Sequence, residues 1–118
     1  VIAIVPYSTF EEAVTMAKAN LLVEGAGHSA ALHSNNDENI QKAGVELPIS
    51  RLVVNQPSST SAGGSLTNGF APTTTLGCGS WGGNSISENL DYKHLMNVSR
   101  IGKVIPDKKV PTDDEIWA

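Results

Sequence analysis

The chain has 118 residues, 8 of them basic and 12 acidic, which gives a net charge of −4 and a pI near 5.2. This length fits one domain, and the acidic balance excludes the electrostatic footprint of a nucleic-acid-binding protein. Hydrophobic residues make up 40% of the chain, and no apolar run approaches the roughly 20 residues that span a bilayer. We therefore expect a packed core and no contact with a membrane.

The first seven residues are almost all apolar, which is typical of a strand buried on both faces of a parallel sheet. Pro6 is expected near its end, because proline cannot donate a hydrogen bond to a neighbouring strand. Since the chain starts at Val1, without Met and inside this apolar run, we expect a piece of a larger protein that begins within a strand.

A helix is predicted over residues 9–24. Two overlapping capping-box spacings, Ser8 with Glu11 and Thr9 with Glu12, mark its start, and apolar residues then recur at intervals of three and four. Gly25 or Gly27 supplies a left-handed stop.

Two further strands and a second helix complete the first region, residues 1–56. Residues 29–33 and 51–55 are short, apolar and bounded by turn formers, which favours buried strands. Between them a short helix is predicted over residues 38–43, ended by Gly44. The order strand, helix, strand, helix, strand predicts an α/β fold of parallel strands with crossover helices.

The composition changes in the second region, residues 57–91. Positions 57–89 hold seven of the eleven glycines and twelve serines or threonines, so we expect no helix there. Such a long loop is usually either functional or disordered, and a flexible Gly/Ser linker is the alternative. An ordered loop that lines a site is favoured because large apolar residues are scattered through it (Leu66, Phe70, Leu76, Trp81 and Ile86).

The third region, residues 92–118, regains strand-like content at 97–101. It ends in an acidic turn over residues 112–117, whose Trp117 we expect to pack on a surface.

Cys78 is the only cysteine, which excludes an internal disulfide framework. One cysteine and three histidines are too few for a typical structural zinc site, so we predict no metal. The absence of a possible internal disulfide fits a reducing, cytoplasmic setting. Glycines on both sides of Cys78 are expected to leave backbone amides open to a ligand. A nucleophilic thiolate needs a nearby base, cation or helix N-terminus, and the local sequence supplies none, which favours a small buried residue.

Two histidines are candidates for proton transfer. His28 follows two glycines at the joint between the first predicted helix and the next strand, and it is either a base or a hydrogen-bonded structural residue. Ligands of open α/β sheets bind beyond the carboxyl ends of strands, which favours His33 and Ser34 instead. The residues alone do not choose between the two ends.

Gly77, Gly79 and Gly82 match the spacing of a dinucleotide-binding Gly-x-Gly-x-x-Gly motif. The preceding strand is weak and no basic residue follows nearby, so we interpret the match as coincidence.

Residues 76–89, Leu-Gly-Cys-Gly-Ser-Trp-Gly-Gly-Asn-Ser-Ile-Ser-Glu-Asn, resemble the signature of the coenzyme A-acylating aldehyde dehydrogenases. Four other stretches resemble the same family, at residues 10–14, 24–29, 50–57 and 94–102. The branch of CoA-dependent succinate-semialdehyde dehydrogenases also shares the segments at 36–40 and 115–117. The acetaldehyde enzymes share the glycine loop but less of the tail.

This resemblance implies an oxidoreductase that converts an aldehyde, CoA and NAD(P)+ to acyl-CoA and NAD(P)H. Succinate semialdehyde or acetaldehyde is the implied substrate. In the family the nucleophilic cysteine and the dinucleotide-binding domain lie upstream, so the resemblance covers only the C-terminal part. A piece without them is expected to be inactive alone.

The resemblance also implies roles for residues of this chain. His28 matches a histidine proposed in the family as general base. The loop that would line the tunnel where aldehyde and CoA thiol meet comprises Thr75, Leu76, Gly77, Cys78, Gly79, Ser80 and Trp81, with Cys78 not the nucleophile. Gly83 takes a position where the succinate-semialdehyde branch can have an arginine to serve the substrate carboxylate.

The implied partners are the aldehyde, CoA, the remainder of a parent chain and, through the strand and tail at residues 92–118, further copies in a homo-oligomer. The alternative is a non-catalytic α/β module in which the loop at 57–89 binds a ligand or a protein partner.

Overall fold

The structure is a computed structural model that describes residues 2–118, and Val1 lies outside the described residues. Four α-helices, two strands and two 3-10 turns follow one another along these residues: α1 (Phe10–Val23), β1 (Gly27–Leu32), α2 (Asp37–Glu46), β2 (Ile49–Val54), α3 (Ser58–Ser61), η1 (Ser80–Gly82), η2 (Tyr92–Leu95) and α4 (Asp113–Trp117). In this part of the chain, every helix is too short or too polar to cross a membrane.

Helix α1 begins and ends where the sequence predicts. Thr9 is its N-cap, and the Thr9 hydroxyl accepts a hydrogen bond from the Glu12 amide at 3.2 Å. The Glu12 carboxylate turns back to accept from the Ser8 amide at 2.8 Å, one residue before the partner that a capping box uses. At the other end Gly25 has a φ of +105°, the left-handed region in which a glycine ends a helix without strain.

The two strands are parallel and joined by α2, which confirms the predicted α/β arrangement. Ser29 lies opposite Arg51 and Leu32 lies opposite Val54. The predicted stop of α2 at Gly44 is wrong, because the helix continues through Gly44 to Glu46. It ends where Pro48 forces the preceding residue out of the helical region.

The predicted strand over residues 1–7 is not formed in the part that the structure describes, residues 2–7. This segment has no regular structure, and Ile2 and Ile4 are 90% and 92% exposed. An apolar run becomes a strand only by pairing, and the sheet of the described chain holds β1 and β2 alone. The run has a strand-like composition, but no neighbour among residues 2–118 pairs with it.

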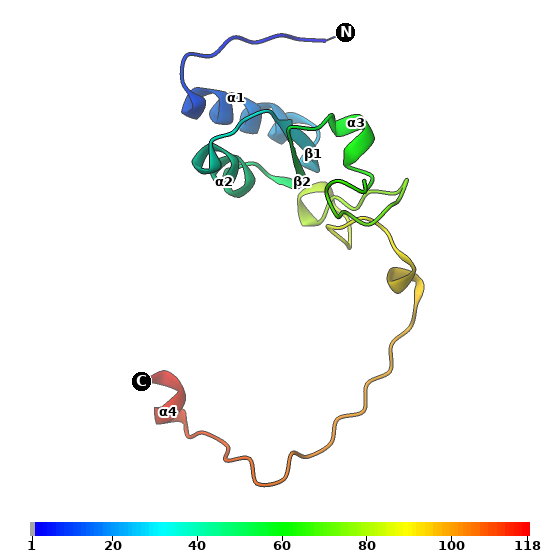
Figure 1. Ribbon diagram of the computed structural model, residues 1–118. Helices are drawn as coiled ribbons and strands as arrows, with labels where there is room; N and C mark the ends of the chain where they lie inside the picture. Colours follow the sequence, from blue (N-terminus) through cyan, green and yellow to red (C-terminus); the bar gives the residue numbers. More distant parts are fainter. Residues whose placement is uncertain (1) are drawn as a thin grey trace.

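The sheet is covered on both sides (Figure 1). Helices α1 and α2 pack on one side, where Val14, Ala43, Leu47 and Ile49 form the buried core. Residues 57–91 fold back on the other side, so that α3 and η1 both contact β1. The expectation of no helix in this region is wrong for α3 and for the η1 turn, each of which is a single short turn.

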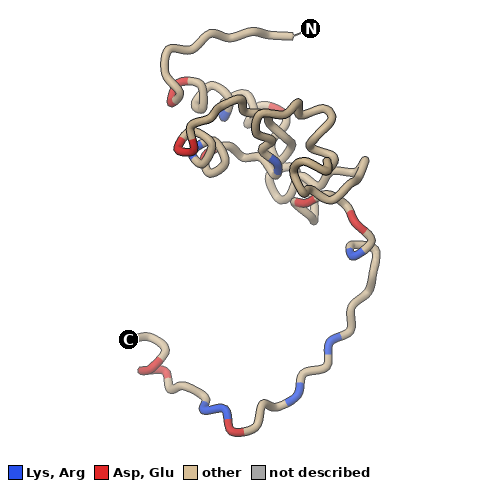
Figure 2. The backbone as a smooth tube through the Cα atoms, viewed as in Figure 1, with Lys and Arg blue, Asp and Glu red and all other residues tan. Residues whose placement is uncertain are grey.

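Residues 96–112 leave this body as an extended tail, without the strand predicted at 97–101 (Figure 1). The radius of gyration is therefore 19.7 Å, against roughly 13 Å for a compact chain of this length. Most of the tail's charges are basic (Figure 2). At its end Thr112 and Glu115 form a capping box for α4, and Trp117 is 84% exposed, so the surface we expected it to pack on is not found among residues 2–118.

Candidate functional site

The glycine loop, residues 75–83, is held by hydrogen bonds to the segment that follows it, residues 84–88. The amides of Gly77 and Gly79 donate to the carbonyls of Glu88 and Ile86, at 3.1 and 2.7 Å. The Cys78 amide donates to the Asn84 side-chain oxygen at 2.9 Å. The expectation of amides open to a ligand is therefore wrong, because the loop uses them to close on itself.

These bonds also bear on the Gly-x-Gly-x-x-Gly spacing. The Gly82 amide donates to the Gly79 carbonyl at 3.2 Å, so the amides of all three motif glycines are engaged within the protein. A phosphate cradle needs such amides free and converging on one point. This loop does not supply them.

Gly27 allows the loop to lie directly against β1. A Cβ at this position would lie 2.0 Å from the Cys78 carbonyl oxygen, and Gly27 has a φ of +83°. Both the contact and the backbone conformation require glycine. Cys78 is buried as predicted, at 5% exposure, and its position follows from this close approach.

Arg51 joins the strands to the loop, and sequence reasoning missed it. Its side chain is buried, at 4% exposure, beneath the loop. The guanidinium donates from Nε to the Ser29 hydroxyl at 3.0 Å and from Nη1 to the Gly77 carbonyl at 2.8 Å. A longer contact of 3.5 Å joins Nη2 to the Gly27 carbonyl. The sequence does contain a signal for this burial, because strand alternation puts Arg51 on the same face as Ile49 and Val53.

His28 lies in β1 between Gly27 and Ser29, with its side chain exposed. It borders two hollows. The first has a volume of about 510 Å³ and is otherwise lined by small and hydroxyl-bearing residues (Ser29, Ser58, Ser59, Ala62, Gly63, Thr73 and Thr74) and Leu76. The second, of about 350 Å³, lies between the end of α1 and Trp81. Among residues 2–118 the imidazole is exposed and no hydrogen bond of its side chain is found.

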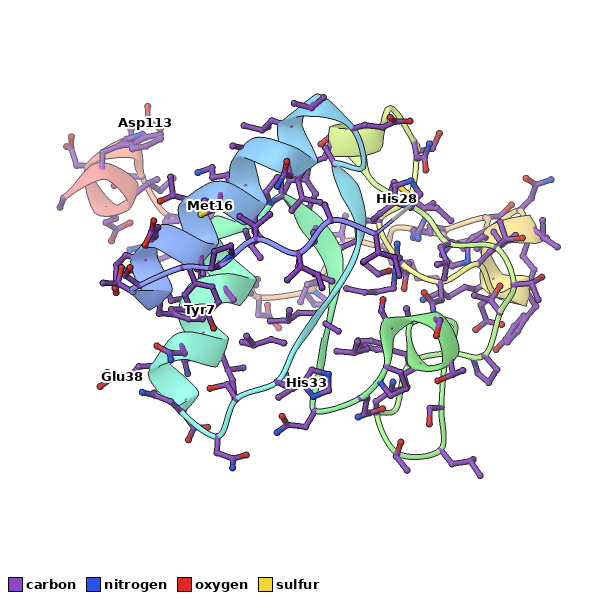
Figure 3. The ribbon with its side chains drawn as sticks, turned by 90° about the horizontal axis from the view of Figure 1, so that it is seen from above. Tyr7, Met16, His28, His33, Glu38 and Asp113 are labelled. Atoms are coloured by element: carbon purple, nitrogen blue, oxygen red, sulfur yellow. The ribbon has the colours of Figure 1, made fainter. Side chains whose placement is uncertain are left out.

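His33 lies beyond the end of β1 opposite to His28 (Figure 3), and Ser34 follows it in the chain. The Ser34 amide and carbonyl are both bonded to the Asn55 side chain, each at 3.0 Å. These two hydrogen bonds, called the clasp below, join the segments that follow β1 and β2, at the end of the sheet away from the glycine loop. The structure thus brings His28, and not His33, beside the loop.

The seven loop residues expected to line a tunnel divide into three groups. Leu76 and Trp81 each border a hollow that also contains His28. Gly77, Cys78 and Gly79 are buried beneath the loop surface, whereas Thr75 and Ser80 are exposed. Gly83 is exposed, has a φ of +69°, and has no atom within 4 Å of a would-be Cβ.

A charged cluster lies where the loop region meets the tail. Glu88 accepts hydrogen bonds from Lys93 at 2.7 Å and pairs with the His94 Nε2 at 3.0 Å. The Lys93 ammonium, and after it His94, lower the pKa of the Glu88 carboxyl below its ordinary value of 4.5. The same bond to Glu88 raises the pKa of Lys93. Within residues 2–118, no three His, Cys, Asp or Glu side chains gather in a way that could hold a metal ion.

No protein-family model matches the chain. Individual proteins do. The succinate-semialdehyde dehydrogenase (acetylating) of Clostridium kluyveri is 67% identical over 99% of this chain and 26% of its own length. A sulfoacetaldehyde dehydrogenase of an Acholeplasma species is 39% identical over 99% of this chain and 24% of its own length. The crystal structure of a probable aldehyde dehydrogenase from Listeria monocytogenes superposes with a TM-score of 0.77 and 36% identity, over 93% of this chain and 23% of that one.

The parallel strand pair, its two helices and the loop folded over β1 are thus an aldehyde dehydrogenase substructure. The chain spans about a quarter of the length of the curated relatives it matches. Within that class, the chain is a homologue of acetylating and acylating aldehyde dehydrogenases, and this confirms the resemblance carried by residues 76–89.

Proposed function

We propose that the chain is the C-terminal part of an enzyme that oxidises an aldehyde with CoA and NAD(P)+ to acyl-CoA, NAD(P)H and a proton. Family membership supports the reaction type. The single observation that carries the assignment to this part of the molecule is the position of His28. Its imidazole is exposed, borders two hollows, and lies against the loop that carries the family signature.

In this proposal His28 is the general base. Histidine is the side chain that most often serves as a general base, and the exposed imidazole of His28 borders the hollows beside the loop. The proton would come from the CoA thiol, because the thiolate and not the thiol attacks the acyl group. The nucleophilic cysteine that forms the acyl intermediate is not Cys78, which is a buried residue of the loop itself.

The hollow beside His28 fits one end of CoA. Five hydroxyl side chains line it, and hydroxyls can donate to and accept from the amides of the pantetheine arm. Lys and Arg are not among the lining residues, so the diphosphate end does not belong there. The dinucleotide has no such match in residues 2–118, since the glycine loop amides are already engaged, and we assign it no residue of this chain.

The substrate is proposed to be succinate semialdehyde, with acetaldehyde as the alternative. The two curated relatives named above act, by their names, on succinate semialdehyde and sulfoacetaldehyde, which are both aldehydes with an acidic group. Gly83 lacks the cation that could hold such a group. Steady-state comparison of succinate semialdehyde, sulfoacetaldehyde and acetaldehyde, in a longer enzyme containing this chain, therefore decides the substrate.

The exposed apolar residues of the tail support its proposed role as an oligomer contact. Light scattering of the longer enzyme, with and without residues 96–118, would test this role.

Two measurements test the catalytic proposal. In a longer enzyme containing this chain, His28→Ala is expected to lower kcat by roughly 10²–10⁴-fold, and His33→Ala at the other end of β1 is the matched control. An unchanged kcat for His28→Ala would refute the role of His28. The isolated 118-residue chain is expected to be inactive. CoA- and NAD(P)-dependent turnover by it would refute the proposal that the nucleophile and the dinucleotide-binding domain lie outside this chain.

A further inference from the structure

The guanidinium of Arg51 is a buried charge that the proposed reaction does not use. Its exposure is 4%, and it forms no ion pair with any Asp or Glu among residues 2–118. A buried cation is costly unless hydrogen bonds satisfy it, so its three oxygen partners account for its presence.

Two of those partners flank His28 in the chain. Ser29 and Gly27, whose hydroxyl and carbonyl face the guanidinium, are the residues directly after and before His28 in β1. The third partner, the Gly77 carbonyl, belongs to the glycine loop. One side chain thus contacts the residues on both sides of the candidate base and the loop opposite it.

We propose that Arg51 is a positioning residue that sets the distance between His28 and the glycine loop. Its catalytic consequence rests on the proposed function, whereas its effect on the loop does not. Only a guanidinium suits this role, because its donors form a planar fork that reaches acceptors on β1 and the loop together. A lysine ammonium in the same place keeps the charge but cannot reach the acceptors on β1 and those on the loop at the same time.

The loop carries its own reporter. Cys78 is the only cysteine and follows Gly77, the loop partner of Arg51. With 5% of its surface exposed, it reacts with a thiol reagent only when the loop opens. The rate at which an aromatic disulfide reagent modifies Cys78 in the full chain therefore measures loop opening without any need for enzyme activity.

Arg51→Lys is expected to raise this rate roughly 10- to 100-fold, with unchanged far-UV circular dichroism. Arg100→Lys, in the exposed tail, is the matched control and is expected to leave the rate unchanged. An equal rate in both variants would overturn the proposal. So would a native chain in which Cys78 reacts as fast as in concentrated guanidinium chloride.

Ser29→Ala is the second variant, in case Arg51→Lys does not fold. It removes only the acceptor of the Nε bond, so a rise of about 5- to 10-fold is expected, and no rise would count against the clamp. In the longer enzyme, Arg51→Lys is expected to lower kcat in the native background but not in a His28→Ala background. A residue that merely stabilises the fold would lower kcat in both, and the labelling result stands even if that enzyme oxidises no aldehyde.

Discussion

Gly27→Ala tests the contact on which the site depends. The new Cβ would lie 2.0 Å from the Cys78 carbonyl oxygen and 2.8 Å from its carbonyl carbon, distances at which one backbone segment must move. The φ of +83° adds a second cost, because an L-residue in the left-handed region loses about 1–2 kcal/mol. Overpacking of a closed contact typically costs about 1–3 kcal/mol. Together they predict a loss of roughly 2–5 kcal/mol of unfolding free energy, a large share of the stability of a typical domain.

Urea denaturation followed by far-UV circular dichroism measures this loss. Gly102→Ala is the matched control, since Gly102 has no positive φ and no atom within 4 Å of a would-be Cβ. If Gly27→Ala unfolds at the same urea concentration as Gly102→Ala, the loop does not lie against β1 and the site described here is wrong. If only the loop is displaced, faster modification of Cys78 accompanies a smaller loss of stability.

Thr9→Ala removes the N-cap of α1 and is expected to cost about 1 kcal/mol in the same urea assay, whereas Thr9→Ser should cost almost nothing. Asn55→Ala loses the clasp on Ser34 and puts alanine at a φ of 55°, for a loss of roughly 2–4 kcal/mol. Asn55→Gly loses the clasp without the strain, so equal losses in the two variants would contradict the backbone argument. Because the pKa of Glu88 is lowered, its ionised form stabilises the Lys93 contact above the ordinary value of 4.5, and this stabilisation is lost as pH falls through the lowered pKa. NMR titration should find the carboxyl midpoint below 4.5 and move it upward in Lys93→Met, and a midpoint at or above 4.5 in the native chain would contradict the pairing.

Elements with local signals could be predicted from the sequence. The cap at Thr9 and the periodic apolar residues after it locate α1 within one residue at each end. The end of α2 was misjudged because two stop signals compete there. Gly44 permits a stop, but within a helix it costs only about 1 kcal/mol relative to alanine, whereas Pro48 enforces a stop by sterics.

Elements that need a partner could not be predicted. The apolar runs at 2–7 and 97–101 have strand-like composition, yet neither is a strand in the described chain. Strand composition reports a tendency to pair and be covered, and the partner is a property of the tertiary structure. The same composition leaves large side chains exposed along both runs (Ile2, Ile4, Val5, Val98 and Ile101).

The candidate site shows the same division between local and distant information. The resemblance to the family pointed to the glycine loop and to His28, because each lies in a contiguous resembling stretch, residues 76–89 and 24–29. The closure of the loop amides was not predicted, since their acceptors, such as Ile86 and Glu88, lie up to eleven positions away across an irregular turn. Arg51 illustrates what could still be recovered: an arginine that alternates with Ile49 and Val53 in an apolar strand is either paired or misassigned. No acidic residue pairs with Arg51 among residues 2–118, and its acceptors are the Ser29 hydroxyl and two backbone carbonyls. Both carbonyls belong to glycines, Gly27 and Gly77, where two segments of backbone approach each other closely.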